Sequence, residues 1–316
     1  MIVVAGEALV DLIPTQGGEL GVNPGGGPFN TARWLGRLGA DTAFLGTIAA
    51  DPLGQRLRDE LVATGVALDL VVATQLPTTL ALAQLDAAGA AQYSFYTQGT
   101  SSGELSVEQV IDLLPDTLDA LYVGGLGLVL EPIATALTQA VGLARSRGAL
   151  VMVDPNIRAA LIEDRAVYLA WFDAVLAQTD VLKLSVEDLA WLVPSEPAPV
   201  AARALLGRGP QVVILTAGAD GATVLTVDGE TTVPAVTVDV VDTIGAGDAF
   251  SAGFLVHWLR GGEGNAWPPR ISFPAPVQHE AVVEAAVFAA RAGALACSVR
   301  GATPPADSAA RLQAAA

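Results

Sequence analysis

The sequence predicts a single α/β domain whose central sheet is mainly parallel and is covered by helices on both sides. Short apolar runs alternate with helical patterns along most of the 316 residues. Several of these runs are apolar at nearly every position, as expected for strands that are buried on both faces. The composition, 52% hydrophobic and 16% charged, is that of a chain that buries a core.

The expected strands and helices follow one another in a regular order. We expect strands at Ile2–Ala5, Ala43–Ile48, Ala120–Val123, Leu150–Val153, Val181–Leu184 and Val212–Thr216. We expect helices at Asn30–Leu38, Leu53–Thr64, Ile133–Arg147, Arg165–Ala177, Val186–Leu192, Val200–Leu206 and Ala249–Leu259. Alternation of strand and helix is typical of parallel strands joined by helical crossovers.

Two segments, residues 9–22 and 71–98, interrupt this order. Within the second, Thr79–Leu85 and Ala91–Tyr96 alternate in polarity and are separated by the turn sequence Asp-Ala-Ala-Gly. We therefore expect both segments to form β hairpins outside the main sheet, as a small cap on the domain.

The end of the chain contains two segments without periodicity. Residues 261–276 are rich in Gly and Pro and are expected to form a surface loop between two helices. Residues after about 303 are expected to be a frayed tail. The domain therefore covers residues 1–305, and residues 306–316 form the tail.

The charge and the cysteine count exclude several classes of protein. With 16 Lys+Arg against 33 Asp+Glu, the net charge is −17, so the mean field repels a nucleic-acid backbone. The longest apolar stretch, near residues 120–130, is too short to cross a membrane, and no signal peptide is evident. The single cysteine, Cys297, excludes an internal disulfide and a cysteine-based metal site. We expect a soluble cytoplasmic protein with no nucleic-acid or membrane partner.

The strongest local signal is the glycine-rich sequence Asp-Thr-Ile-Gly-Ala-Gly-Asp at residues 242–248. An alternating run at 237–241 precedes it, which predicts a strand, and a helix follows. Backbone N–H groups at such a turn and the helix N-terminus can hold an anion. Asp248, in the first helical turn, can accept a proton from a hydroxyl group while the turn holds a phosphate. Alternatively, Asp248 is an ordinary helix cap.

Polar residues near the N-terminus form a second candidate site. The glycines Gly25, Gly26 and Gly27 precede the first helix and allow a ligand to approach the backbone closely. Asn30 either caps that helix or offers its amide to a polyhydroxylated ligand. Asp11 follows a buried strand and either accepts two sugar hydroxyl groups or faces water.

Further candidates follow strands, where open α/β sheets bind ligands. Arg158 either binds a phosphate or another anionic group, or is solvated. Ser185 and Asp188 form a capping box, or else Glu187 and Asp188 act on a magnesium ion through its outer shell. The turn at residues 216–221 either holds nucleotide phosphates or ribose, or is a plain hairpin turn.

Other catalytic motifs are absent from the sequence. It contains no G-x-x-x-x-G-K-[ST] phosphate-binding loop. The two histidines, His257 and His279, are too few for a histidine-rich metal site.

Taken together, these segments resemble the ribokinase/PfkB family of carbohydrate kinases over about residues 2–305. The C-terminal signature of that family is met throughout residues 242–255, and the N-terminal signature at Gly25, Gly26, Asn30, Ala32 and Gly39. The resemblance implies a ribokinase-like three-layer sandwich with a small β lid. It also implies ATP-dependent transfer of the γ-phosphate to a sugar hydroxyl group, with Mg²⁺ as a cofactor.

The resemblance also implies roles for individual residues. Asp248 would be the base, and the backbone of Gly245, Ala246 and Gly247 the anion hole. The sugar would be held by Asp11, Gly26, Gly27, Asn30, Tyr96 and Arg158, and the nucleotide by Lys183, Ser185, Thr216, Gly218, Gly221 and Gly247. Asp188 and Glu187 would act indirectly on Mg²⁺, and Asp242 and Thr243 on a possible K⁺.

Two departures from the family's pattern concern the nucleotide and the metal. The N-x-x-E sequence of the family is replaced by Ser185 and Asp188, and an asparagine expected near the nucleotide base is replaced by Ala290. The lid of this family often mediates dimerisation, so a homodimer through the lid is expected.

Segments 6–14, 27–30 and 94–96 look most like the fructokinase branch, so fructose is the expected substrate. The 2-keto-3-deoxygluconate kinase branch is close, but it generally has an arginine after the lid tyrosine, where this chain has Thr97. A kinase of a phosphosugar would need basic residues near the lid, and residues 9–22 and 71–98 contain none. A non-catalytic member that only binds a sugar or nucleotide is the third alternative.

Overall fold

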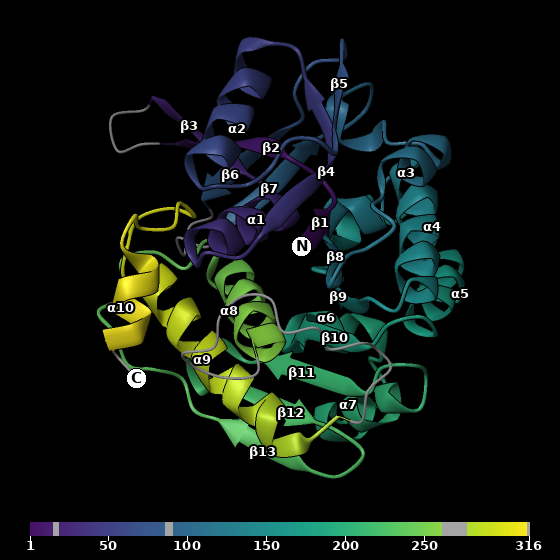
Figure 1. Cartoon of the computed structure of the whole chain (residues 1–316), viewed down its shortest axis with the longest axis vertical. Coiled ribbons are helices and arrows are strands. Elements are labelled where there is room, and N and C mark those ends of the chain that lie inside the picture. The colour runs from purple at the N-terminus through teal and green to yellow at the C-terminus, as the bar shows by residue number, and fades with distance from the viewer. Residues whose placement is uncertain (15–18, 86–90, 261–276, 315–316) are drawn as a thin grey trace.

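The computed structural model describes residues 1–14, 19–85, 91–260 and 277–314, which form two β-sheets and their covering helices (Figure 1). The strands of the larger sheet, in spatial order, are β13 (Glu230–Val233), β12 (Ala222–Leu225), β11 (Val212–Thr216), β10 (Val181–Ser185), β9 (Leu150–Asp154), β8 (Ala120–Gly124), β1 (Ile2–Ala5), β4 (Thr42–Ala49) and β5 (Val71–Thr74). Neighbours from β11 to β5 pair in parallel, and only the β12 and β13 edge is antiparallel. The predicted mainly parallel sheet is therefore confirmed.

Alternate side chains of each strand contribute to two separate cores, one on each face of the sheet. In β1, Ile2 and Val4 belong to one core, and Val3 and Ala5 to the other. The first core is covered by α1 (Gly27–Arg37), α2 (Pro52–Ala63), α8 (Ala246–Arg260), α9 (His279–Cys297) and α10 (Ser308–Ala314). The second is covered by α3 (Val107–Leu113), α4 (Ile133–Ser146), α5 (Arg165–Leu176), α6 (Val186–Leu192) and α7 (Ala198–Leu206). These are the three layers that the sequence predicts.

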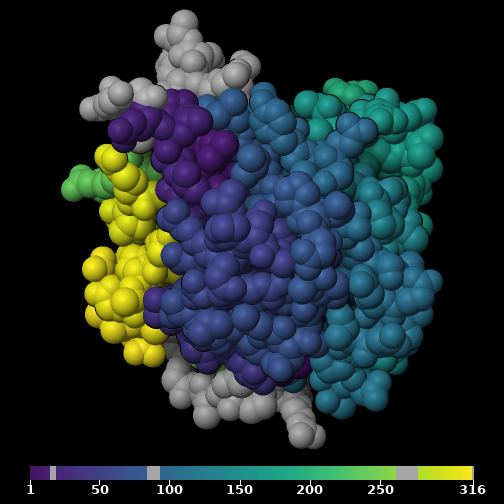
Figure 2. Space-filling view, turned by 90° about the horizontal axis from the view of Figure 1, so that it is seen from above, coloured from purple at the N-terminus to yellow at the C-terminus, as the bar shows by residue number. Residues whose placement is uncertain are grey.

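The smaller sheet forms the expected cap. Its order is β3 (Leu20–Gly25), β2 (Leu9–Pro14), β6 (Leu80–Leu85) and β7 (Ala91–Tyr96). The two hairpins, β2–β3 and β6–β7, are joined by parallel pairing of β2 with β6. Figure 2 shows the face of the molecule that is formed by the N-terminal third of the chain, with the C-terminal segment in yellow at its left side. One part of the expectation is wrong, because β5 pairs with β4 at the edge of the main sheet.

Two other local predictions differ from the structure. Residues 237–241 are not a strand, since the backbone N–H groups of Val241 and Asp242 donate to the carbonyl of Cys297 at the end of α9. Residues 308–314 are not a frayed tail, because α10 packs against α9 and buries Leu312. The predicted loop at 261–276 and the turn at 86–89 lie outside the described residues.

The order of the strands fixes where ligands can bind. From β1 the chain proceeds outward to β4 and β5, then returns to β8 on the other side of β1 and continues toward β13. Loops that leave β1 and β8 therefore diverge, and a crevice opens at the carboxyl ends of these strands. No helix within the described ranges is long and apolar enough to cross a membrane.

Candidate active site

A cavity of about 430 Å³ lies at the carboxyl ends of the strands, under the small sheet. It contains most of the residues expected at a sugar site, although they come from distant parts of the chain. Its lining includes Glu7, Leu9, Asp11, Gly26, Gly27, Asn30, Tyr93, Phe95, Asp154, Asn156, Arg158, Lys183, Ser185, Asp188, Thr216, Thr243, Gly245, Gly247 and Asp248.

Asp248 is a buried carboxylate that lines this cavity from α8. It lies in the first turn of α8, and its Oδ2 accepts a hydrogen bond of 2.9 Å from Nδ2 of Asn30. Burial raises the pKa of Asp248 to about 7, although the Asn30 hydrogen bond and the charges of Lys183 and Arg158 act in the opposite direction. A carboxylate with its pKa near neutrality is suited to accept a proton from a hydroxyl group.

Asn30 does not cap α1, which was one of the two predicted roles. The helix begins at Gly27, and Gly26 is its N-cap. Asn30 lies inside the helix, and its Oδ1 has no hydrogen-bond partner within the described residues. The side chain therefore joins Asp248 at the cavity, and Oδ1 is free to accept a hydrogen bond from a ligand.

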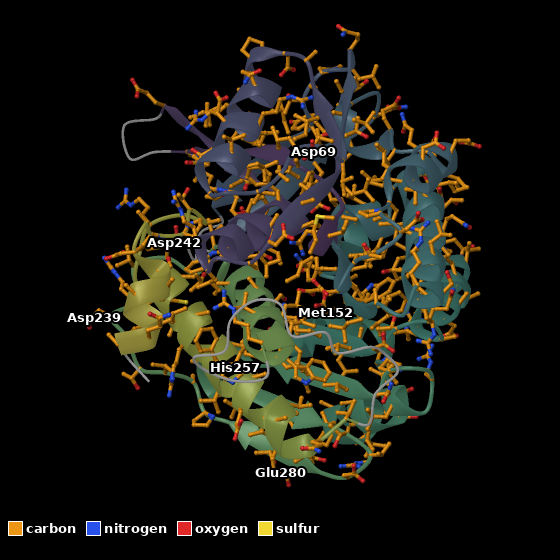
Figure 3. All side chains as sticks on the ribbon, in the orientation of Figure 1. Asp69, Met152, Asp239, Asp242, His257 and Glu280 are labelled. Atoms are coloured by element: carbon orange, nitrogen blue, oxygen red, sulfur yellow. The ribbon has the colours of Figure 1, made fainter. Side chains whose placement is uncertain are left out.

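The glycine turn before α8 has the geometry of an anion site. Gly245 adopts φ of 79°, which favours glycine, and α8 begins at the next residue. The N-terminus of this 15-residue helix is directed at the cavity, so its N–H groups and dipole favour negative charge there. Asp242 lies before the turn, where its two oxygens accept from the N–H groups of Ile244 and Gly301; it is labelled in Figure 3.

Glu7, which the sequence analysis did not identify, joins two loops of the cavity. One oxygen accepts a hydrogen bond from the N–H of Gly27 at 3.1 Å, and the other from the N–H of Gly127 at 3.2 Å. Burial raises the pKa of Glu7 to about 7. The only signal in the sequence is an acidic residue directly after a fully buried strand.

Of the sugar-site residues expected on the small sheet, Asp11 lines the first cavity and Tyr96 does not. Asp11 lines the cavity from β2, and burial raises its pKa to about 6, opposed by the charge of Arg158. Tyr96 is 55% exposed and is not part of the lining. Tyr93 and Phe95 line the cavity instead, because alternate residues of β7 point to opposite faces of the strand.

Arg158 is held at the cavity by the loop after β9. Its Nη1 donates to Oδ1 of Asn156 at 2.7 Å and to the Asn156 carbonyl at 3.1 Å. Asn156 has φ of 42°, a left-handed conformation that asparagine tolerates better than most residues. This turn directs the guanidinium toward the acidic residues of the lining.

The capping box predicted at the start of α6 is present. The N–H of Asp188 donates to Oγ of Ser185, and the N–H of Ser185 donates back to Oδ2 of Asp188, both at 3.0 Å. Oδ1 of Asp188 accepts from the N–H of Ile157 at 2.7 Å. Glu187 is exposed and is not part of the lining, so only Asp188 of this pair faces the cavity.

A second cavity of about 550 Å³ lies next to the first. Thr216, Thr243 and Gly247 line both cavities, so the two meet at the glycine turn. Gly218, Gly221 and Ala290 line the second cavity, as expected for a nucleotide site, and no charged side chain of the described residues does. Lys183 and Ser185, assigned to the nucleotide from the sequence, line only the first.

His257 and Cys297 behave as packing residues. His257 lies on α8, is buried, and packs its ring against Phe288 of α9 at 5.1 Å between centroids (Figure 3). Cys297 is half-buried at the wall of the second cavity, and burial raises the pKa of its thiol. Neither reaches the first cavity.

Comparison with known proteins shows which proteins this chain is similar to. The model of the pfkB family of carbohydrate kinases matches residues 1–309. A fructokinase of Rhizobium leguminosarum bv. trifolii is 38% identical over 259 residues, which cover 81% of this chain and 78% of that protein.

Solved structures resemble the whole fold. A fructokinase of Xylella fastidiosa with bound ATP superposes with a TM-score of 0.88 at 27% identity, covering 99% of this chain and 98% of that one. A double mutant of the Vibrio cholerae fructokinase, bound to fructose, ADP and potassium, superposes with a TM-score of 0.85 at 25% identity, covering 99% and 97%.

Proposed function

Because this chain belongs to the pfkB family of carbohydrate kinases, we propose that it transfers the γ-phosphate of ATP to a hydroxyl group of fructose, with Asp248 as the base. The family makes it an ATP-dependent sugar kinase, a phosphotransferase with an alcohol group as acceptor. The observation that carries the proposed mechanism is the position of Asp248, buried between a cavity for the sugar and the glycine turn.

The reaction follows from the positions of these groups. A sugar in the first cavity donates a hydrogen bond from the attacking hydroxyl group to the Asp248 carboxylate. The carboxylate takes the proton as the bond from the sugar oxygen to the γ-phosphorus forms, while the bond from that phosphorus to the bridging oxygen of ADP breaks and ADP leaves. The N–H groups of the glycine turn and the N-terminus of α8 stabilise the charge on the transferred phosphoryl group. The nucleoside occupies the second cavity, which joins the first at Gly247.

The charges of the first cavity favour a neutral sugar over an anionic one. Among the described residues, its lining holds the carboxyl groups of Glu7, Asp11, Asp154, Asp188 and Asp248 and two cationic side chains, Arg158 and Lys183. Both 2-keto-3-deoxygluconate and a phosphosugar carry an additional negative charge into this site. Fructose carries none, and the names of the similar proteins agree with it.

The residues present fit a magnesium ion that is bound mainly by the phosphates. No group of three or more His, Cys, Asp or Glu in the described part of the chain is placed to hold a metal. Asp188, whose oxygens already accept hydrogen bonds, would bind water of such an ion, which commonly keeps several waters. The ion would neutralise phosphate charge. For K⁺, Asp242 and Thr243 remain the candidates, and K⁺ dependence of the rate tests them.

We also propose a cytoplasmic location, where ATP is available, and a homodimer formed through the small sheet. Two large apolar side chains of that sheet, Leu20 and Tyr96, are 51% and 55% exposed. Burial of such side chains at a protein interface is favourable. Sedimentation of the purified protein tests the dimer.

An assay of ADP release with Mg·ATP tests the substrate. Against fructose, 2-keto-3-deoxygluconate, ribose, adenosine and fructose 1-phosphate, we expect selective turnover of fructose. Selective turnover of the keto-deoxy acid would contradict the argument from charge but keep the kinase mechanism. Folded protein that binds ATP and turns over none of these compounds would favour a binding role.

The pH dependence tests the ionisation of the base. Asp248 acts as a base only when it is ionised, and its pKa is raised to about 7. We expect kcat/KM to fall about tenfold per pH unit below this value and to reach a plateau above it. Rates with saturating Mg·ATP and subsaturating fructose, measured across the acidic to mildly basic range, give this profile. A rate that stays constant well into the acidic range would contradict the raised pKa.

A further inference from the structure

Lys183, the only lysine of the chain, is buried in the wall of the first cavity. It is 6% exposed, and its Nζ lies 2.6 Å from Oδ2 of Asp154, which is itself 1% exposed. The same oxygen accepts hydrogen bonds from the hydroxyl groups of Tyr122 and Ser251, each at 3.3 Å. A buried ammonium group needs such compensation, because burying an unpaired charge is costly.

The register of the sheet explains why these two side chains meet. Val181 of β10 pairs with Met152 of β9, and Leu182 with Val153, so that Lys183 lies next to Asp154 at the ends of neighbouring strands. Val181 and Met152 belong to the core under α8, and side chains two residues apart share a face. Lys183 and Asp154 therefore point toward α8.

The ammonium group lies under the first turn of α8. A Cβ atom added to Gly247 would be 3.0 Å from Nζ of Lys183, and Asp248 is the next residue. Lys183 lines the cavity that contains Asp248 and does not line the second cavity. Its position is thus beside the base and away from the nucleoside.

We propose that Lys183, anchored by Asp154, is a positioning residue that keeps the Asp248 carboxylate ionised and ready to take the proton of the sugar. This inference rests on the proposed role of Asp248 as the base. It replaces the assignment of Lys183 to the nucleotide, which the sequence had suggested.

The charges around Asp248 show why a cation is needed there. Asp154 from β9 disfavours the ionised form of Asp248, whereas Lys183 from β10, Arg158 from the loop after β9, and the amide of Asn30 from α1 favour it. Other titratable groups of the described residues in these surroundings are Glu7 after β1, Asp11 on β2, Tyr93 on β7, Tyr122 on β8 and Asp188 on α6. Without Lys183, two buried carboxylates would oppose each other, and Asp248 would hold its proton to higher pH.

The pH profile of Lys183→Met tests the proposal, with Lys183→Arg and Ser251→Ala as matched variants. We expect Lys183→Met to move the acidic limb of kcat/KM upward by about one pH unit or more, because an opposite charge nearby shifts a carboxyl pKa by this amount. Lys183→Arg keeps the charge and should restore most of the wild-type midpoint. Ser251→Ala removes a hydroxyl group from the same Asp154 oxygen without changing charge, so its midpoint should not move.

A different result would overturn the proposal. If Lys183→Met lowers kcat/KM by the same factor at every pH, Lys183 acts on the phosphates or on the fold. The proposed base is tested separately, since an Asp248→Asn enzyme as active as the wild type would remove it whatever Lys183 does.

A second measurement uses the wild-type fold, because loss of one partner of a buried ion pair can prevent folding. Lysine labelled with ¹³C at Cε and ¹⁵N at Nζ gives one side-chain signal, since the chain has a single lysine. We expect this signal to remain that of an ammonium group and to show an inflection as Asp248 titrates. The inflection should be absent in Asp248→Asn. The same titration curve in both proteins would overturn the proposal.

Discussion

Replacing Asp248 with asparagine is expected to lower kcat by about 10³-fold, because a positioned base commonly contributes 10²–10⁴-fold. The variant should fold, since asparagine has the same shape and its Oδ1 can still accept the hydrogen bond from Asn30. Fructose binding should therefore change little. Turnover at saturating Mg·ATP and fructose, together with calorimetric binding of fructose, separates the two effects. Near wild-type turnover would refute the assignment of the base.

The same substitution is expected to stabilise the fold at neutral and basic pH. The pKa of Asp248 is raised in the folded state from 3.8 to about 7. As the pH rises through this range, the unfolded chain loses its proton first, so the folded state loses stability until the folded pKa is passed. Removing the carboxyl group removes this cost, on the order of 2–4 kcal/mol above the folded pKa.

Denaturant unfolding at pH 4 and at pH 8 measures this gain. The increase in the free energy of unfolding should be small at pH 4 and largest at pH 8. Asp69→Asn is a suitable control, because Asp69 is exposed and does not line either cavity (Figure 3). If the free energy of unfolding increases by the same amount at pH 4 and at pH 8, the folded protein does not bury an ionised Asp248.

Replacing Gly247 with valine is expected to lower kcat/KM by about 10²-fold or more, because misplacing reacting groups by an ångström can have an effect of this size. Gly247 lines both cavities. Its added Cβ would lie 3.0 Å from Nζ of Lys183, and the two methyl groups of valine would fill the space between the sugar and the nucleoside. Steady-state kinetics with varied ATP and fructose measure the loss, and the KM for ATP should also rise.

A valine at Gly142 is the matched control. Gly142 lies inside helix α4, where an added Cβ meets only Oε1 of Gln178, at 3.2 Å. Both substitutions replace a helical glycine with the same β-branched residue, so their effects on helix propensity are small and similar. Gly247 does not have a positive φ, so valine there is not strained by the backbone. If Gly247→Val and Gly142→Val are equally active, the idea that the phosphoryl group is transferred beside Gly247 is wrong.

The strands and helices of the main sheet could be predicted because burial imposes a regular pattern on them. The run at residues 237–241 alternates like a strand, but no strand of the described residues pairs with it. Its last residue bonds to the carbonyl of Cys297, 56 residues away, which no local pattern encodes. Similarly, the sequence predicts residues 71–74 as part of the cap, whereas β5 pairs with β4 in the main sheet. This pairing depends on the tertiary fold, which the local sequence pattern does not show.

The glycine turn and its aspartate could be predicted from seven consecutive residues, but other parts of the site could not. Glu7 is recognisable only through Gly27 and Gly127, which the fold brings to its two oxygens. Side chains of β7 alternate between its two faces, so Tyr96 lies on the opposite face from Tyr93 and Phe95. The sequence does not indicate which of these faces covers the cavity. The pairing of Lys183 with Asp154 required the register of two strands.

The position of the single lysine has a consequence for chemical labelling. Amine-reactive reagents find only two primary amines in the chain: the α-amino group of Met1, which pairs with Asp119, and the enclosed Nζ of Lys183. No lysine is left for the outer surface, so all other cationic side chains there are arginine or histidine. A fluorophore or a solid support should therefore attach faster at the α-amino group of Met1 than at Lys183. Slow acylation of Lys183, followed by mass spectrometry, then records how often the cavity admits a reagent.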